Sequence, residues 1–364
     1  MKIVADENMP LVRELFAPFG EVHTYPGREL RIEQVRDADV LLVRSVTRVN
    51  ASLLEGSSVR FVGSATIGVD HVDQYYLENS GIAFANAPGC NANAVVQYVL
   101  SALFRVRPVW MHQTVGIIGC GNVGGRLYRT LKSLGVNCRC YDPFLTSEQN
   151  PDLCSFDEVL DASILCLHTP LTTSGPHPTY HLLDEKALRR FSPGGLLINA
   201  GRGAVVDNEA LLRLLPECAW QVVLDVWERE PQLSLPLLQQ VNIGTPHIAG
   251  YSWDGKVNGS FMVRDALCNW LGQAVPTQAE PLETVDLIKV TTLAKAILAV
   301  YDVANDDRGM RGTLLGGVPD IGESFDRLRK HYPQRLEFHH YRVRGVADRQ
   351  LAEQLTALGF QVAR

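Results

Sequence analysis

The sequence predicts an α/β protein with two doubly wound parallel sheets and a smaller C-terminal α+β domain. Three observations support this prediction. The 364 residues exceed what one ordinary hydrophobic core accommodates. Short apolar runs alternate with helical patterns as far as about residue 274, which is typical of βαβ units and a parallel sheet. After that point the sequence is more charged and mainly helical in pattern.

The first sheet is predicted from four apolar runs near the start of the chain, which are KIVAD, DVLLVRS, VRFVGSA and GIAFANA. Helical patterns at Met9–Phe19 and Val72–Ser80 lie between these runs, and a long helix is expected at about Ala92–Val106. We therefore expect a first domain over residues 1–92, completed by about 249–278.

The second sheet is predicted from a more regular series of strands: TVGIIGCG, NCRCYD, SILCLHT, GLLINA, QVVLDVW and NIGTPH. These runs are nearly all apolar, as strands covered on both faces should be. Six such strands with intervening helices predict a doubly wound dinucleotide-binding domain over about residues 93–248.

The remaining residues, 279–364, are expected to form a separate domain behind a linker, TQAEPLETVD. Its predicted elements are an amphipathic helix (LAKAILAVYDVANDD), a basic segment (FDRLRKHYPQR), a strand (LEFHHYRV) and a final helix (DRQLAEQLTALGF). We interpret the basic run Arg327, Arg329, Lys330 and His331 as a solvated helix face.

Composition excludes several classes of protein. The net charge of −6 and pI of about 5.9 argue against a nucleic-acid partner, which requires a basic surface. No apolar run approaches the roughly 18 residues that span a bilayer, and charges interrupt the first apolar run, so neither a membrane partner nor a signal peptide is expected. The eight cysteines are scattered without a C-x-x-C pair, which predicts reduced thiols, no metal site and a cytoplasmic location.

A glycine-rich turn follows the first strand of the second sheet. Gly119, Gly121 and Gly124 form G-x-G-x-x-G between a strand and a helix, where a pyrophosphate binds the helix N-terminus. Asp142 lies 18 residues after Gly124, at the end of the next strand. An acid there binds ribose hydroxyls and repels a 2′-phosphate, so the pattern predicts NAD over NADP. A tight turn with a surface aspartate is the alternative.

Three ionisable residues follow successive strands of the same sheet. Arg202 lies between two glycines in LINAGRGAVVD, Glu230 lies in VVLDVWEREP, and His247 lies in NIGTPHIAGYS. Because ligands bind at the carboxyl ends of parallel strands, we expect these three side chains to share a catalytic site. Taken singly, each would be an ordinary loop residue.

These motifs together resemble the D-isomer-specific 2-hydroxyacid dehydrogenase family over about residues 1–270. The resemblance implies a Rossmann NAD domain, a flavodoxin-like substrate or lid domain, and Arg202, Glu230 and His247 as catalytic residues. Histidine has a suitable pKa to accept the substrate hydroxyl proton, glutamate fixes its tautomer, and arginine binds the carboxylate. The cofactor is expected to be NAD, contacted by Gly119, Gly121, Asn122, Val123, Gly124, Asp142, Thr169, Ala200, Gly201, Arg202, Asp225 and Gly250.

Further segments resemble one branch of this family, which oxidises 4-phospho-D-erythronate in vitamin B6 biosynthesis. They are DENMP, VRSVT, APGCNA, TSGPHPTYHL, HIAGYSWDGK and FDRLRKHYPQR. This resemblance covers the whole chain and implies a homodimer formed through the C-terminal domain. It also implies substrate contacts by Ser45, Thr66 and Tyr251, to which we add Arg44 as a neighbouring cation. At Gln97 the wider family commonly carries glutamate.

Two alternatives remain open at this point. The substrate could be another hydroxy acid, such as phosphoglycerate or the reduced form of a short 2-oxo acid. The chain could instead be an NAD-sensing scaffold that has the fold without the activity.

Overall fold

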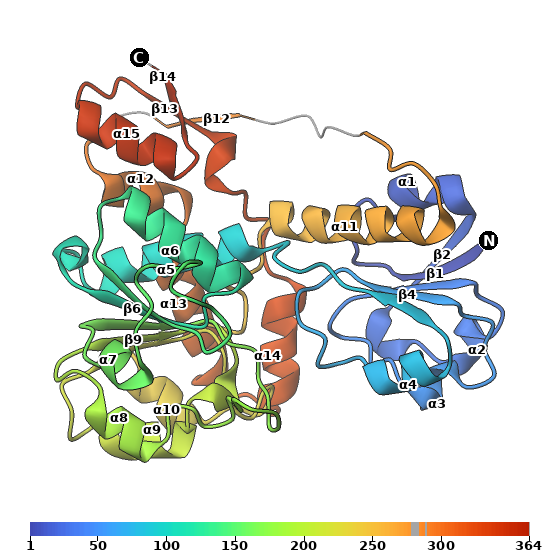
Figure 1. Cartoon of the computed structure of the whole chain (residues 1–364), viewed down its shortest axis with the longest axis horizontal. Helices are drawn as coiled ribbons and strands as arrows, with labels where there is room; N and C mark the ends of the chain where they lie inside the picture. Colours follow the sequence, from blue (N-terminus) through green and yellow to red (C-terminus); the bar gives the residue numbers. More distant parts are fainter. Residues whose placement is uncertain (278–283, 288–289, 364) are drawn as a thin grey trace. The chain divides into compact units, whose positions relative to one another are not determined.

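The computed structural model describes residues 1–277, 284–287 and 290–363, and the chain divides into two compact units (Figure 1). Unit 1 comprises Met1–Asn91 and Ser252–Pro281, and unit 2 comprises Ala92–Tyr251 and Leu282–Arg364. The division into three functional domains stays a prediction, because the C-terminal residues share a unit with the second sheet.

Unit 1 contains a parallel five-stranded sheet in the order β2-β1-β3-β4-β5. Its strands are β1 (Lys2–Asp6), β2 (Glu21–Tyr25), β3 (Val40–Val43), β4 (Phe61–Ser64) and β5 (Ala83–Ala85). Its helices are α1 (Val12–Phe16), α2 (Ile32–Val35), α3 (Ala51–Leu54), α4 (Gln74–Asn79) and α11 (Trp253–Leu271). Apolar residues of α1 and α11 pack on one face of the sheet, and those of α2, α3 and α4 on the other.

Unit 2 contains a parallel six-stranded sheet in the order β11-β10-β9-β8-β6-β7. Its strands are β6 (Val115–Ile118), β7 (Cys138–Tyr141), β8 (Ile164–Leu167), β9 (Leu196–Asn199), β10 (Gln221–Leu224) and β11 (Ile243–Gly244). All six predicted strands are confirmed. The strand order reverses between β6 and β8, which is where ligands bind in such sheets.

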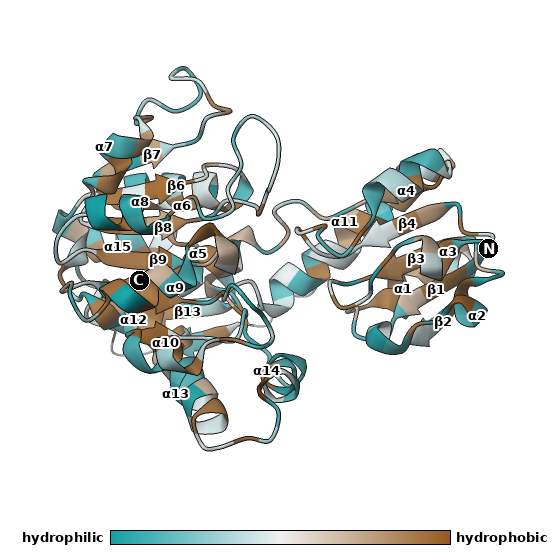
Figure 2. Ribbon diagram, turned by 90° about the horizontal axis from the view of Figure 1, so that it is seen from below, coloured by the Kyte–Doolittle hydropathy of each residue, from teal (hydrophilic) through white to brown (hydrophobic). Residues whose placement is uncertain are grey.

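The helices of this part of unit 2 are α5 (Ala92–Val106), α6 (Asn122–Ser133), α7 (Phe156–Leu160), α8 (Glu185–Arg190), α9 (Asn208–Leu214) and α10 (Leu235–Gln240). The predicted bounds of α5 are confirmed. Figure 2 shows apolar residues concentrated on the strands, with hydrophilic residues frequent on the helices and loops.

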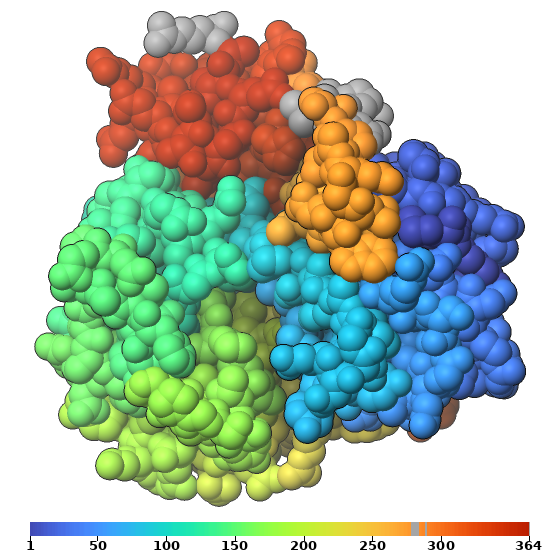
Figure 3. Space-filling view, turned by 45° about the vertical axis from the view of Figure 1, so that its right-hand side comes forward, coloured from blue at the N-terminus to red at the C-terminus, as the bar shows by residue number. Residues whose placement is uncertain are grey.

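The C-terminal residues form a small parallel sheet in the order β12-β13-β14. Its strands are β12 (Val285–Leu287), β13 (Tyr341–Arg344) and β14 (Gln361–Ala363), and its helices are α12 (Leu293–Val300), α13 (Val303–Leu314), α14 (Ile321–Lys330) and α15 (Arg349–Ala357). Leu293, Ile297 and Phe338 belong to the same buried cluster as α5 and α6 residues, and Figure 3 shows the red C-terminal residues against this part of the unit.

Three C-terminal predictions need correction. The single helix expected over LAKAILAVYDVANDD is two helices, because the Asp302 side chain caps the start of α13 by accepting from the Ala304 amide. The strand expected over LEFHHYRV begins only at Tyr341, after a 3₁₀ turn at Phe338–His340. Most of the predicted linker, residues 278–283, lies outside the described residues, but its last two residues, Val285 and Asp286, are not linker and pair with β13 as part of β12.

Among the described residues, no helix is long and apolar enough to cross a membrane. All eight cysteines are free thiols.

Candidate active site

The glycine-rich turn joins β6 to α6 and has the backbone that a pyrophosphate site needs. Gly119 adopts a positive φ of 84°, which glycine tolerates without strain. A Cβ atom at Gly124 would lie 1.8 Å from the Gly119 carbonyl oxygen, so only glycine allows this close packing. A Cβ atom at Gly121 would meet nothing within 4 Å. The outer side of the turn is therefore open to a ligand, and the residues fit NAD.

Asp142 follows β7 and lies against this turn. Its Oδ2 accepts from the Cys120 amide at 2.8 Å, and its Oδ1 accepts from the Phe144 amide at 3.0 Å. These bonds fix the carboxylate beside the glycine-rich turn. Asn122 and Val123 form the first residues of α6.

Thr169 and Gly201 lie close to each other beyond the ends of β8 and β9. A Cβ atom at Gly119 would lie 2.9 Å from the Thr169 amide nitrogen, and one at Gly201 would lie 3.1 Å from the Thr169 carbonyl oxygen. The Thr169 hydroxyl is buried without a hydrogen-bond partner. A buried polar group of this kind is expected to gain a partner from a ligand or water.

His247 and Glu230 form a hydrogen-bonded pair beyond β11 and β10. The His247 Nδ1 lies 2.7 Å from the Glu230 Oε2, and the other carboxylate oxygen accepts from the Trp227 amide at 2.7 Å. Burial works to raise the pKa of Glu230, but His247, the Trp227 amide and Arg329 outweigh it, so the pKa is lowered. Glu230 is therefore an ionised anchor for the imidazole, whose side chain is 32% exposed.

Asp225 holds the turn that carries His247. The carboxylate is 1% exposed and accepts from the Thr245 hydroxyl and the Ile248 amide through Oδ1 and from the Ala249 amide through Oδ2. The Asp225 carbonyl also accepts from the His247 amide at 2.7 Å. Asp225 thus fixes His247 in its left-handed conformation, with φ of 56°. Its predicted contact with NAD, like that of Gly250, stays a prediction.

Arg202 follows β9, after Ala200 and Gly201. Its carbonyl oxygen accepts from the Asn199 side chain at 3.0 Å, and its Nη1 donates to the Gly201 carbonyl at 2.9 Å. A Cβ atom at Gly203 would lie 2.0 Å from the Trp227 carbonyl oxygen. The loop that carries Arg202 therefore packs directly on the loop that leads to Glu230, so the structure brings these two predicted residues into neighbouring loops.

Ser45 and Thr66 lie in unit 1, two residues beyond Val43 and Ser64, which pair in the register of β3 and β4. Ser45 is exposed. The Thr66 hydroxyl donates to the Gly68 carbonyl at 3.1 Å and shares a hydrogen bond with the Ser64 hydroxyl at 2.9 Å. The two residues therefore follow adjacent strands at one edge of the sheet, as does Arg44.

Tyr251 lies in unit 2 beside a residue that sequence reasoning missed. The Arg329 guanidinium lies over the Tyr251 ring, 5.7 Å from its centre. Arg327, Lys330 and His331 are exposed, but the side chain of Arg329 is only 17% exposed. The interpretation of this run as a solvated face is therefore wrong for Arg329. The helical spacing of Phe325, Leu328, Arg329 and Tyr332 was the available signal, because it puts the arginine on the apolar face.

Other polar residues of unit 2 lie outside this arrangement. Both ring nitrogens of His168 are buried without partners, and burial lowers its pKa to about 4. Gln97 is also buried, and neither of its side-chain polar atoms has a partner. His181, Asp207 and Glu228 come within metal-ligand distance of one another, but the His181 ring bonds Glu228 at 2.8 Å and Asp207 caps α9.

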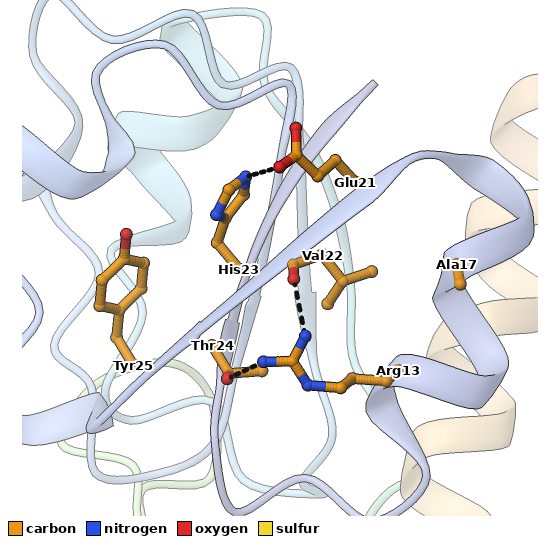
Figure 4. A pocket seen from close by; sticks show the side chains of 7 residues that line it. All are labelled: Arg13, Ala17, Glu21, Val22, His23, Thr24 and Tyr25. Atoms are coloured by element: carbon orange, nitrogen blue, oxygen red, sulfur yellow. Dashed lines mark hydrogen bonds and ion pairs between the residues drawn. The ribbon is translucent and has the colours of Figure 1, made fainter.

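A hollow on the edge strand β2 of unit 1 is not a second site of the same kind (Figure 4). Arg13 lies in it and donates to the Val22 carbonyl and the Thr24 hydroxyl, and Glu21 lies 3.2 Å from the His23 ring. Arg13, Glu21 and His23 are thus engaged with other residues of the hollow.

A dinucleotide turn, an arginine between glycines and a histidine–glutamate pair at strand ends define a dehydrogenase of hydroxy acids. Residues 104–249 match the family D-isomer specific 2-hydroxyacid dehydrogenase, NAD binding domain. Residues 276–359 match a domain of unknown function, DUF3410. The chain is similar to the erythronate-4-phosphate dehydrogenase of Cellvibrio japonicus (strain Ueda107), with 54% identity over 99% of this chain and 100% of the relative. The corresponding protein of Teredinibacter turnerae is 49% identical over 100% of this chain and 99% of its own length.

The chain therefore belongs to the erythronate-4-phosphate dehydrogenase family. Solved structures support the fold. The NAD⁺-bound 3-phosphoglycerate dehydrogenase of Entamoeba histolytica is 24% identical, with a TM-score of 0.65 over 77% of this chain and 99% of that chain. The D-lactate dehydrogenase of Aquifex aeolicus, complexed with NAD and lactic acid, is 20% identical, with a TM-score of 0.61 over 75% and 96% of the two chains. The protein is an NAD-dependent oxidoreductase.

Proposed function

We propose that the protein oxidises 4-phospho-D-erythronate at C2, with NAD, to 2-oxo-3-hydroxy-4-phosphobutanoate, a step of pyridoxine 5′-phosphate biosynthesis. The observation that carries this proposal is the 2.7 Å bond between His247 Nδ1 and Glu230 Oε2. It leaves the other ring nitrogen to act on a substrate hydroxyl. The substrate is taken from the name that the full-length relatives share.

In the proposed mechanism His247 accepts the C2 hydroxyl proton through Nε2, because Nδ1 is engaged by Glu230. The ionised Glu230 stabilises the imidazolium that results. Arg202 binds the substrate carboxylate with its guanidinium fork and stabilises negative charge that develops on the C2 oxygen. Bound NAD would supply the acceptor for the hydride that leaves C2. The glycine-rich turn and Asp142 would hold its pyrophosphate and adenosine ribose, and Thr169, Ala200, Asp225 and Gly250 would make further contacts.

We assign the phosphate end of the substrate to Ser45, Thr66 and Tyr251. Hydroxyl groups at strand ends and backbone amides of a glycine-flanked turn are good donors to a dianion. The C-terminal domain is proposed to make a homodimer, and the protein to act in the cytoplasm. Sedimentation of the purified protein tests the dimer, because a monomer at micromolar concentration would contradict it.

A substrate comparison tests the assignment. The purified enzyme is mixed with NAD and either 4-phospho-D-erythronate, 3-phosphoglycerate or D-lactate, and NADH formation is followed at 340 nm. We expect kcat/KM for 4-phospho-D-erythronate to exceed the other two values by at least about 100-fold, since 3-phosphoglycerate lacks the additional hydroxyl-bearing carbon and D-lactate lacks both that carbon and the phosphate. Preference for 3-phosphoglycerate would refute the substrate, and NAD binding without any turnover would favour a scaffold.

A further inference from the structure

The helix α14 of the C-terminal domain begins against the loop that carries Glu230. A Cβ atom at Gly322 would lie 3.2 Å from the Pro231 Cγ and 2.5 Å from the Gln232 side-chain nitrogen. The same nitrogen donates to Asp320, which caps the helix, at 3.4 Å. Pro231 and Gln232 directly follow the catalytic glutamate. The start of α14 is thus packed on the loop that positions the carboxylate.

The end of α14 and the residues after it contact the turn that follows His247. The Arg329 guanidinium lies over the Tyr251 ring, and the Tyr332 ring packs edge-on against Tyr251, with centres 5.9 Å apart at 80°. Arg335 donates from Nη2 to the Ala249 carbonyl at 2.6 Å. One segment of the C-terminal domain therefore contacts the catalytic turn at two of its residues.

Arg329 has little on its own helix to compensate for burial. Its ion pair with Asp326 is long, at 3.8 Å, and its Nε is buried without a hydrogen-bond partner. Burying a guanidinium is costly unless other charges compensate. Burial works to lower the pKa of Arg329, but Tyr251 and Glu230 outweigh it, with a smaller contribution from Asp326, so the pKa is raised. The compensating groups are therefore mainly those of the catalytic site.

We propose that Arg329 is a positioning residue of the dehydrogenase site, through which the C-terminal domain holds Tyr251 and supplies a positive charge for Glu230. The inference rests on the proposed function. The charged groups that act on Glu230 are His247, from the turn after β11, and Arg329, from α14. Arg329 thus favours the ionised carboxylate that the mechanism needs, and it does so without touching the reacting atoms.

The test compares Arg329→Gln with Arg329→Lys, which keeps the charge, and with Lys330→Gln, which removes an exposed charge from the same helix. Removing the Arg329 charge favours proton uptake by the His247–Glu230 pair, so the acidic limb of the kcat/KM profile moves to higher pH. We expect a shift of about one pH unit in R329Q, hence about a tenfold loss on that limb, with a plateau at high pH within about threefold of wild type. The acidic limbs of the kcat/KM pH profiles of R329K and K330Q should coincide with that of wild type.

Two outcomes would overturn the inference: an R329Q profile that coincides with wild type, or an equal loss at every pH in both R329Q and R329K. Melting temperature and NAD affinity, measured on the same samples, identify a variant that fails to fold. In that case Arg329→Met, whose apolar side chain can pack on Tyr251 and Phe325, replaces glutamine as the neutral variant. If wild type itself turned over no hydroxy acid, the proposed function would fail. If wild type were active but the pH profile of R329Q were not shifted, only the proposed role of Arg329 would be refuted.

Discussion

The two large parallel sheets both place polar residues just beyond the carboxyl ends of their strands, but those residues are held very differently. In unit 2, the Asp225 carboxylate accepts three hydrogen bonds from the turn that carries His247, and His247 is bonded to Glu230. In unit 1, the Thr66 hydroxyl bonds to Ser64 and Gly68 of its own segment, the Thr66 carbonyl accepts from the Ala87 amide at 3.1 Å, and Ser45 is exposed. Catalysis needs groups fixed before the substrate arrives, whereas binding groups can take their partners from the ligand. This difference fits the roles proposed for the two edges, which are catalysis at the edge of unit 2 and substrate binding at the edge of unit 1.

The largest effect on this comparison is expected from removing the proposed general base, His247. In His247→Asn we expect kcat to fall roughly 10²–10⁴-fold, because asparagine can bond Glu230 but cannot accept the hydroxyl proton. NAD affinity should stay within about threefold, since the glycine-rich turn is untouched. Stopped-flow or steady-state NADH formation gives kcat, and titration calorimetry gives the affinity.

The matched control is His177→Asn, because His177 is exposed in a loop and its ring packs only edge-on against Phe144. His177→Asn should leave both kcat and the NAD affinity unchanged. A His247→Asn enzyme with normal turnover would remove the histidine from the mechanism and with it the contrast between the two edges.

The next largest effect is expected at Arg202. Arg202→Lys keeps the positive charge but loses the planar fork that binds a carboxylate with two hydrogen bonds, so we expect kcat/KM to fall about 100-fold. Arg213→Lys is the control, because Arg213 is exposed and pairs with Glu185 on the surface. Initial rates over a range of substrate concentrations measure the effect. Near-normal kinetics in the Arg202 variant would exclude the carboxylate clamp.

The sequence was sufficient for most of the fold of unit 2. Its strands are continuous apolar runs, and buried parallel strands are the elements that composition marks most clearly. In unit 1, the strand β2 (Glu21–Tyr25) was missed because it lies at the edge of its sheet and carries several polar residues. It therefore shows neither a continuous apolar run nor an alternation of apolar and polar residues. The break between α12 and α13 depends on the Asp302 side chain, which caps the start of α13. The residue pattern is helical on both sides of Asp302, so the sequence alone does not show this break.

The candidate site was predicted only where motifs mark it. His247, Glu230 and Arg202 each follow a recognisable strand, so their meeting at one edge follows from the topology of a parallel sheet. Arg329 could not be placed in this way, because Glu230 and Tyr251, the groups that raise its pKa, lie far from it in the chain. A basic residue on an apolar helix face indicates a buried partner, but the partner's identity comes only from the tertiary structure.

The smallest effect is expected at the binding edge. Thr66→Val keeps the shape of the side chain and removes the hydroxyl, and we expect the KM for 4-phospho-D-erythronate to rise about fivefold to tenfold, the net value of roughly one ordinary hydrogen bond. The kcat value should stay within about twofold, because Thr66 takes no part in the chemistry. The dephosphorylated acid, D-erythronate, should show no such rise. Ser45→Ala should behave in the same way.

This comparison also tests whether the Thr66 hydroxyl acts on the substrate or only on its own turn. Loss of its bonds to Ser64 and Gly68 is expected to lower the free energy of unfolding by about 1 kcal/mol, which a melting curve measures independently of KM. If the melting temperature fell while the KM values of both acids stayed constant, Thr66 would be a structural cap. The binding edge of unit 1 would then have to be sought among the backbone amides of the same turn, which a side-chain substitution does not remove.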